Sequence, residues 1–358
     1  MASNTLDLLG RLESIQSDAW IKNCAIVQSI PVEVGRSSFG NLSIEETWKL
    51  HNELHERFKE SRIKPNSLPY ATGISYHDVK TRLARHMLAS CSFCERKCSV
   101  DRVSGKKGSC GVGIEPRVCS AFLHFGEESP LVPSGTIFFA GCNFKCAFCQ
   151  NDDISTDPSN GHVVTADALA KIAMDLGREG AKNINYVGGD PTPNMHLILE
   201  SMKLQQKPVA QLWNSNFYNT VDAIKLLMDV MDIWLPDLKY GNNECAKRLS
   251  GIDEYWTVVT RNLKLVHDEM AIKGWASLVI RHLVLPGHID CCSIPCMEWI
   301  AKNLPHAMVN VMAQYRPQHL VLSNPGKYKE ITRRPTYEEI DTVRKAATSL
   351  GICWKPVS

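Results

Sequence analysis

Three cysteines on one short segment, Cys142, Cys146 and Cys149, form the pattern that points most directly to chemistry. Thiolates at such short spacings hold iron–sulfur clusters, and three of them can occupy three corners of a [4Fe–4S] cubane. Because no obvious fourth ligand lies nearby in the sequence, one iron would keep an open coordination position for a small molecule. The alternative interpretation is a structural zinc ion with a distant fourth ligand.

A second cysteine group lies upstream, where Cys91, Cys94 and Cys98 are followed by Cys110 in a segment rich in glycine and lysine. Four thiols at this spacing can bind zinc or a second iron–sulfur cluster, and the spacing does not distinguish the two. Free buried thiols are the alternative, and Cys119 could replace one ligand.

The cysteine content as a whole favours metal binding over disulfide bonding. Eight of the 14 cysteines lie between residues 91 and 149, and the chain is neither short nor preceded by an export signal. Three more, Cys291, Cys292 and Cys296, follow an expected strand. Because Cys296 falls within an expected helix, buried thiols are the better interpretation of this group.

The composition is that of an ordinary globular protein of 358 residues, with 44% hydrophobic and 22% charged residues. It excludes collagen-like, disordered and coiled-coil chains. The net charge of +2 gives neither an electrostatic footprint for nucleic acid nor a polybasic membrane patch. The N-terminus lacks the order of a signal peptide, and no apolar run approaches the ~20 residues that cross a bilayer. We therefore expect a cytoplasmic protein.

The elements that must position these cysteines change in character along the chain. Residues 1–90 read as a helical region, with a capped helix from Ser43 to Phe58, a loop marked by Pro65 and Pro69, and another helix at 76–89. Residues 91–134 form a cysteine-rich knuckle, and residues 135–358 alternate strand and helix patterns. Strands are expected at 136–140, 184–187, 209–213, 233–238, 278–285 and 309–315. Helices are expected at 165–178, 195–204, 219–231, 254–271, 293–303 and 336–349.

This alternation predicts an α/β fold in which parallel strands are covered by helices on their outer face. Every Gly/Pro or polar cluster of the C-terminal region lies at the carboxyl end of an expected strand. In barrel-like sheets the loops after successive strands converge there, whereas a doubly wound sheet gathers its site at one switch point. We therefore predict a partial (β/α)6 barrel preceded by the helical and cysteine-rich regions.

The segment around the three cysteines resembles the radical S-adenosylmethionine (SAM) superfamily, whose hallmark is C-x3-C-x-aromatic-C with Phe148 at the aromatic position. The surrounding sequence is similar to the branch of pyruvate formate-lyase activating enzyme, from about Cys91 to Tyr315. The resemblance implies a [4Fe–4S] cluster whose open iron binds SAM, and reductive cleavage of SAM to a 5′-deoxyadenosyl radical. It also implies an electron donor such as ferredoxin or flavodoxin.

Other motifs at the carboxyl ends of strands match this family. Gly188–Pro191 resembles its GGEP motif with Asp for Glu, and Asn214–Asn216 stands where activating enzymes carry an acidic residue before Thr-Asn. Asp237 and Lys239 match a D-x-K pattern of the family, in which Asp237 could hold a cation or ammonium group and Lys239 a carboxylate; a surface ion pair is the alternative. Arg281 lies on an expected strand, where an unpaired cation is costly to bury. The cofactor-binding residues implied are Phe148, Gly188, Gly189, Asp190, Pro191, Asn214, Ser215, Asn216, Asp237, Lys239 and Arg281.

The function implied by the resemblance is that of a radical SAM enzyme, with hydrogen abstraction from a glycine of a partner protein. A different peptide or a small molecule is an alternative substrate. A non-catalytic iron–sulfur electron-transfer protein is the alternative from another class. The neutral charge and the lack of interleaved basic and aromatic residues argue against an RNA substrate.

Overall fold

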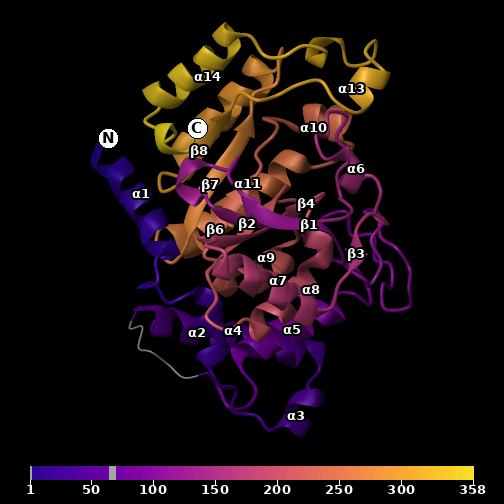
Figure 1. The fold of residues 1–358 in the computed structure, drawn as a ribbon, viewed down its shortest axis with the longest axis vertical. Coiled ribbons are helices and arrows are strands. Elements are labelled where there is room, and N and C mark those ends of the chain that lie inside the picture. Colours follow the sequence, from indigo (N-terminus) through magenta and orange to yellow (C-terminus); the bar gives the residue numbers. More distant parts are fainter. Residues whose placement is uncertain (1, 64–69) are drawn as a thin grey trace.

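Eight strands form one open sheet in the computed structural model, which describes residues 2–63 and 70–358 (Figure 1). Their order is β3-β1-β2-β4-β5-β6-β7-β8, so β3 and β8 are the edges of the sheet. The strands are β1 (Arg117–His124), β2 (Ser134–Phe139), β3 (His162–Val163), β4 (Asn183–Gly188), β5 (Ala210–Ser215), β6 (Ile233–Pro236), β7 (Ser277–Leu283) and β8 (Met308–Met312).

Six of these strands, from β2 through β4 to β8, are parallel. The helices along this part of the chain are α6 (Asp152–Ser155), α7 (Ala166–Arg178), α8 (Met195–Leu204), α9 (Val221–Leu227), α10 (Asn243–Ser250), α11 (Tyr255–Val266), α12 (Ile294–Asn303), α13 (Leu320–Ser323) and α14 (Tyr337–Ser349). The carboxyl ends of parallel strands meet at one rim. This arrangement confirms the predicted partial (β/α)6 barrel.

The hairpin of β1 and β2 differs from the sequence-based expectation, which places no strand before residue 135. β1 is antiparallel to β2, and β3 is antiparallel to β1 at the edge. Within β1 only Val118 is buried, so the strand lacks the alternation of apolar and polar residues by which a half-buried strand is recognised. Two antiparallel strands therefore extend the parallel sheet on one side.

Helix α7 illustrates how the sequence builds the outer layer. Thr165 caps its start by accepting a hydrogen bond from the backbone N–H of Ala168. Its buried residues recur at helical spacing and turn one stripe toward the sheet. They are Leu169, Ala170, Ala173 and Leu176.

The N-terminal region is helical, as expected. Ser43 forms a capping box with Glu46 at the start of α4, and Pro65 and Pro69, where a loop is expected, lie outside the described residues. The helices are α1 (Ala2–Gln16), α2 (Asn23–Ser29), α3 (Arg36–Gly40), α4 (Ile44–Ile63) and α5 (Tyr76–His86). Helices α2, α4 and α5 lie together beneath the sheet in Figure 1.

A buried ionic network fastens this region to the barrel just before β6. The fully buried Asp229 carboxylate accepts a hydrogen bond from Tyr76 at 2.8 Å and lies 3.3 Å from the Lys80 ammonium. Asn23 likewise donates to the backbone carbonyls of Met231 and Trp275, which precede β6 and β7. The helical region therefore covers the amino ends of the strands, opposite the rim that carries the cysteine loop. Among the described helices, none is long and apolar enough to cross a membrane.

Candidate active site

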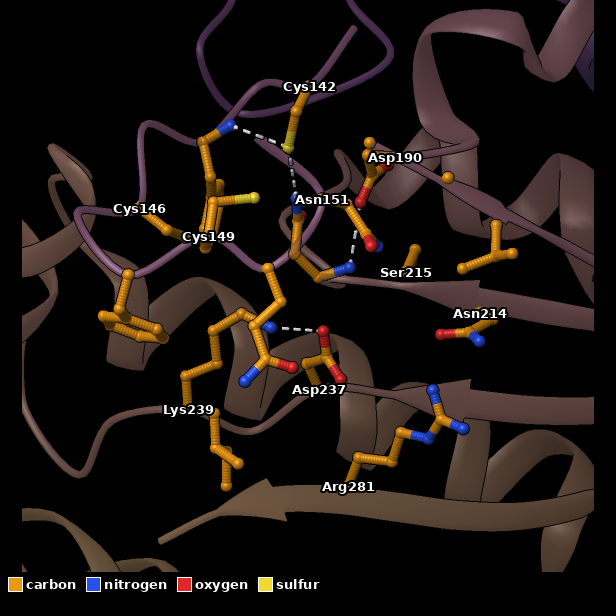
Figure 2. A pocket seen from close by; sticks show the side chains of 18 of the residues that line it. Cys142, Cys146, Cys149, Asn151, Asp190, Asn214, Ser215, Asp237, Lys239 and Arg281 are labelled. Carbon is orange, nitrogen blue, oxygen red and sulfur yellow. Dashed lines mark hydrogen bonds and ion pairs between the residues drawn. The ribbon is translucent and has the colours of Figure 1, made fainter. Parts of the chain in front are cut away.

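The loop that follows β2 carries Cys142, Cys146 and Cys149 toward one cavity of about 220 Å³ at the carboxyl rim of the sheet (Figure 2). It is held by the end of α10, because the N–H groups of Lys145 and Ala147 donate to the carbonyls of Ser250 and Leu249. Three thiols from one loop therefore face the same space.

Each of these sulfur atoms has a polar hydrogen-bonding neighbour. The backbone N–H of Phe144 donates to the Cys142 sulfur at 3.3 Å, and Ser250 Oγ donates to the Cys146 sulfur at 3.0 Å. The Cys149 sulfur lies 3.2 Å from Ser155 Oγ. Donors in these places stabilise negative charge on sulfur, and hydrogen bonds to cluster sulfurs tune iron–sulfur centres.

Burial disfavours the ionised form of two of these thiols, Cys142 and Cys146. It raises the pKa of Cys142 well above its usual value and that of Cys146 to about 11, although Lys239 opposes the second shift. A thiolate here needs a nearby cation, which a bound iron provides. Three convergent thiols, each with a hydrogen-bonding neighbour, fit an iron–sulfur cluster.

Two glycines at the carboxyl end of β4 bring a second backbone segment against the cysteine loop. Gly188 has a φ of +128°, and a Cβ there would lie 2.2 Å from the Phe139 nitrogen. A Cβ on Gly189 would lie 2.3 Å from the carbonyl oxygen of Gly141, which immediately precedes Cys142. Only glycine permits this approach, which leaves the backbone exposed to the cavity.

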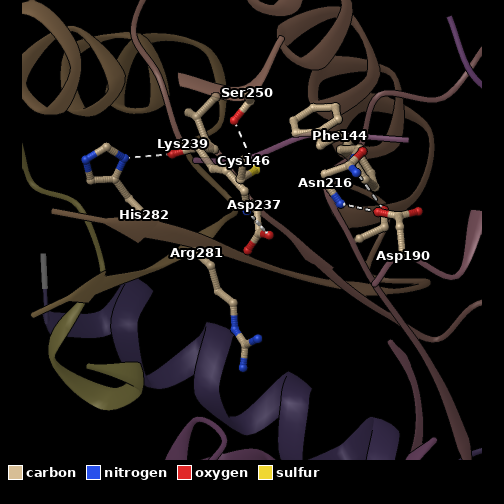
Figure 3. Close-up of polar contacts among 12 residues, drawn as sticks. Phe144, Cys146, Asp190, Asn216, Asp237, Lys239, Ser250, Arg281 and His282 are labelled. Carbon is tan, nitrogen blue, oxygen red and sulfur yellow. Dashed lines mark hydrogen bonds and ion pairs between the residues drawn. The ribbon is translucent and has the colours of Figure 1, made fainter. Parts of the chain in front are cut away.

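Both carboxylate oxygens of Asp190 bind backbone groups of the protein. One carboxylate oxygen accepts the N–H of Thr192 and the other accepts the N–H of Asn216, both at 2.9 Å (Figure 3). Its burial raises its pKa to about 6, and the hydrogen bonds from Asn216 and Thr192 oppose this shift. Asp190 therefore joins the loop after β4 to the loop after β5, as a positioning residue. Pro191, next in the chain, is the one sequence-predicted residue of this motif that does not line the cavity.

The Asn214–Asn216 segment offers one free polar group to the cavity. Asn216 is engaged within the protein, since its side-chain amide donates to Asn143 at 2.6 Å and lies 3.8 Å from the Cys142 sulfur. Ser215 accepts the N–H of Phe217 at 3.2 Å. Asn214 is buried and lines the cavity, and its Nδ2 has no hydrogen-bond partner among the residues that the structure describes. Such an orphaned donor fits a polar ligand in the cavity.

Asp237 and Lys239 form an ion pair at the end of β6, and both line the cavity. Burial opposes the charge of Lys239, but the Asp237 carboxylate and the nearby thiol of Cys146 raise its pKa. The Lys239 backbone N–H is fixed by Tyr255, whose hydroxyl accepts it at 2.7 Å. The pair thus places one fixed positive and one fixed negative charge beside the cysteine loop.

Arg281 of β7 is already paired, which explains how a cation can lie on a buried strand. Its guanidinium makes two hydrogen bonds to Glu128, at 2.8 and 3.0 Å, and a third to Glu127. Burial alone would lower the pKa of Arg281, but the two carboxylates raise it. Arg281 still lines the cavity, yet its charge is directed to the segment between β1 and β2.

The aromatic side chains of the cysteine loop form the cavity wall. Phe148 is buried and packs edge-on against Tyr240 and Tyr315, with ring centroids 6.5 and 5.8 Å away. Phe144 packs similarly against Tyr218 and Tyr255. These contacts fix the loop and keep water from its inner face.

The upstream cysteines lie next to this site rather than in it. The Arg96 side chain donates to the Asn143 carbonyl at 3.0 Å, and Cys94 forms a β-bridge with Asn219. A Cβ on Gly108 would lie 3.2 Å from the Cys98 sulfur and 3.5 Å from the Cys110 sulfur, so this glycine lets the segment fold around its thiols. Burial raises the pKa values of Cys91 and Cys110, and that of Cys94 to about 12. A metal or cluster in the knuckle stays a prediction.

Several residues of the site were not predicted from the sequence. Ser250 and Ser155 approach cysteine sulfurs, and Asn143 accepts the amide of Asn216. Ser250 lies 104 residues from Cys146, and no spacing pattern connects them. The apolar wall also includes Leu283 and Met312. Polar side chains at the ends of α10 and α6 are the only sequence signal for the two serines.

Replacing Ser250 with alanine is expected to make the reduction potential of the bound cluster more negative. The change removes the hydroxyl that donates to the Cys146 sulfur, and such donors stabilise the reduced, more negative state. Iron content should stay at the wild-type value. A redox titration followed by electron paramagnetic resonance (EPR) measures the shift, with Ser201→Ala as control because its hydroxyl donates to the Ile198 carbonyl of the same helix. An unchanged potential would contradict the assigned contact.

The sequence is similar to one protein family and to several known proteins. The sequence profile of the Radical SAM superfamily matches residues 136–299, from β2 into α12. An uncharacterized protein of Methanocaldococcus jannaschii is 40% identical over 350 residues, which cover 96% of this chain and 98% of that protein. The 7-carboxy-7-deazaguanine synthase of Methanothermobacter thermautotrophicus is 27% identical over 228 residues, 60% of this chain and 92% of that enzyme. The pyruvate formate-lyase 1-activating enzyme of Escherichia coli is 24% identical over 152 residues, 39% and 61% of the two chains.

Proposed function

Because the chain belongs to the radical SAM superfamily, whose members use a [4Fe–4S] cluster and SAM, we propose that Cys142, Cys146 and Cys149 hold that cluster. When bound, the cluster supplies one electron that cleaves SAM to methionine and a 5′-deoxyadenosyl radical, which removes a hydrogen atom from the substrate. We further propose that this substrate is a glycine of a partner protein. The observation that carries the first proposal is the convergence of three buried or half-buried thiols on one cavity.

The residues around the thiols suit the methionine part of SAM. The backbone after β4 is bare at Gly188 and Gly189, so a ligand can lie against its peptide groups. The unpartnered Asn214 amide can donate to a carboxylate, and Asp237 can accept from an ammonium. Apolar side chains such as Phe144 and Met312 line the cavity and limit the entry of water. A primary alkyl radical requires this exclusion, because it reacts with almost any group that it meets.

A second cavity, of about 600 Å³, supports access for a substrate from the open side of the barrel. It shares Arg281 and Met312 with the cysteine cavity and is bordered by the turn after β1 and by β8. At its border Phe125 is 70% exposed, and an exposed aromatic residue beside a cavity is typical of a protein-binding surface. These features favour a peptide segment as the substrate. A small molecule, the alternative, has support from the similarity to the deazaguanine synthase.

Deuterium transfer distinguishes the two substrates. Lysate from cells grown on [2,2-²H₂]glycine is separated by size into macromolecules and small molecules, and each fraction is added to reduced enzyme with SAM. We expect one deuterium in 5′-deoxyadenosine from the macromolecular fraction and a glycyl-radical EPR signal on a protein. Deuterium from neither fraction, with unlabelled 5′-deoxyadenosine formed, would contradict glycine as the hydrogen donor.

Two variants serve as controls for this assay. Cys146→Ala should give no transfer from either fraction, because it lacks a cluster ligand. Phe125→Ser should reduce transfer from the protein substrate and leave SAM cleavage without substrate unchanged, because Phe125 lies outside the cysteine cavity. Transfer from the small-molecule fraction alone would favour the alternative substrate.

A further inference from the structure

Four side chains with metal-binding atoms gather at a second place on the carboxyl rim, away from the cysteine loop. Cys245 lies on α10, His288 follows β7, and Cys291 and Cys292 lie in a single wide helical turn (η5, Ile289–Ser293) that precedes α12. One ligand atom from each lies within 4.8 Å of all the others. The sequence favoured buried thiols here, and Cys292 and Cys296 are buried, whereas Cys291 is exposed.

The spacing of these atoms is that of a single metal ion. The sulfurs of Cys245 and Cys291 are 3.9 Å apart, and those of Cys291 and Cys292 are 3.8 Å apart. Zinc–sulfur bonds of ~2.3 Å at tetrahedral angles require sulfurs about 3.8 Å apart. A disulfide needs sulfurs at ~2.05 Å, so the pairs are not bonded to each other. Thiolates on separate irons of a cubane cannot all lie this close.

The imidazole of His288 completes the set. Its Nδ1 lies 3.3 Å from the Cys291 sulfur, 3.6 Å from that of Cys245 and 3.9 Å from that of Cys292. Zinc with one nitrogen and one sulfur ligand at ~2.0 and ~2.3 Å requires these atoms about 3.5 Å apart. The other ring nitrogen, Nε2, lies 3.3 Å from the Arg248 guanidinium and 3.6 Å from a carboxylate oxygen of Glu330, which pairs with Arg248. These two side chains hold the ring with its Nδ1 turned toward the three sulfurs.

The backbone is shaped to bring the two segments together. Asn242 caps α10 by accepting the N–H of Cys245 at 2.8 Å, and the same side chain donates to the Cys291 carbonyl at 2.8 Å. Beside it, a Cβ on Gly241 would lie 2.8 Å from the carbonyl oxygen of Cys292. Wide helical turns such as η5 are rare and often mark functional positions.

We propose that Cys245, His288, Cys291 and Cys292 bind one Zn²⁺ ion in a closed, structural Cys₃His site. The three thiols release their protons to solvent on binding, and His288 binds as the neutral imidazole through Nδ1. Four protein ligands leave no open position, so the ion cross-links α10 to the segment before α12. Because α10 also carries Ser250, which contacts Cys146, the cross-link fixes one support of the cysteine loop. The proposal does not depend on the function of that loop.

Metal content of the full-length protein tests this site. Protein produced with zinc supplementation is analysed by plasma mass spectrometry, and metal-free protein is titrated with Co²⁺ under argon. Cys245→Ser and Cys291→Ser should each lose one equivalent of zinc and the visible bands of one tetrahedral cobalt–thiolate centre. Cys296→Ala is the matched control, because this nearby thiol is not among the four ligands. It should keep the wild-type content.

Thermal stability with and without a chelator provides a second readout besides metal content. Removing zinc should lower the Tm of the wild-type protein and of Cys296→Ala, and leave the Tm of Cys245→Ser unchanged, because a ligand that binds only the folded state stabilises it. Cys245 and Cys291 are partly or largely exposed, so serine is tolerated there, and circular dichroism checks the fold. Equal zinc and cobalt contents in wild type and both serine variants would overturn the proposal. So would a wild-type protein that takes up neither metal.

Discussion

Cys146→Ala is expected to reduce formation of 5′-deoxyadenosine to the background of a reaction without enzyme. The variant keeps Cys142 and Cys149 but removes the central thiol of the loop, and two thiolates do not hold a cubane that already has one corner without a protein ligand. Anaerobic reconstitution should give far less than four irons at this site, and no EPR signal from the reduced cluster. The product is measured by liquid chromatography with dithionite as reductant.

The fold of this variant should survive. Cys146 is only partly buried, and its loop is also held by backbone hydrogen bonds from Lys145 and Ala147 to α10. Cys296→Ala serves as control for the loss of a buried thiol and should keep wild-type turnover. Turnover of Cys146→Ala at the wild-type rate would show that the cluster is held elsewhere.

Gly189→Ala is expected to lower the rate of SAM cleavage by about 100-fold or more. The added methyl group would lie 2.3 Å from the carbonyl oxygen of Gly141, and neither backbone can yield without moving the residue before Cys142. Displacement of reacting groups by about 1 Å can lower a rate by about 100-fold. The dissociation constant of SAM should rise as well, because the same backbone borders the cavity.

The control for this variant is Gly177→Ala in α7. There the new methyl group meets Val209 at 3.5 Å, an ordinary contact, and alanine in a helix is more stable than glycine by about 0.5–1 kcal/mol. Gly177→Ala should therefore keep full activity and gain slightly in Tm. Wild-type kinetics for Gly189→Ala would show that the loop after β4 plays no part in SAM binding or cleavage.

The barrel could be predicted from the sequence because its strands are short apolar runs with helices between them. All residues of β5 are buried, for example, as expected of a strand covered on both faces. The hairpin strand β1 could not, because only one of its eight residues, Val118, is buried and no apolar alternation marks it. Local patterns therefore revealed the core strands and missed β1 and the two-residue β3 at the margin of the sheet.

The residues of the candidate site also divide into those that the sequence revealed and those that it did not. Cys142, Gly188 and Asp237 were found because each follows a strand within a recognisable motif. Contacts between distant segments were not found: Arg281 meets Glu128 from 153 residues away, and Cys245 meets His288 from 43 residues away. Side chains of this kind carry no local spacing pattern, and only the curvature of the barrel brings them together.

The claim on which the account depends is that this chain cleaves SAM reductively. Full-length protein is reconstituted anaerobically with iron and sulfide, its cluster is quantified by Mössbauer spectroscopy, and dithionite and SAM are added. We expect methionine and 5′-deoxyadenosine in equal amounts, at levels that follow the cluster content. Protein with a complete, reduced [4Fe–4S] cluster that forms neither product would contradict the account, and would leave a non-catalytic iron–sulfur protein as the better description.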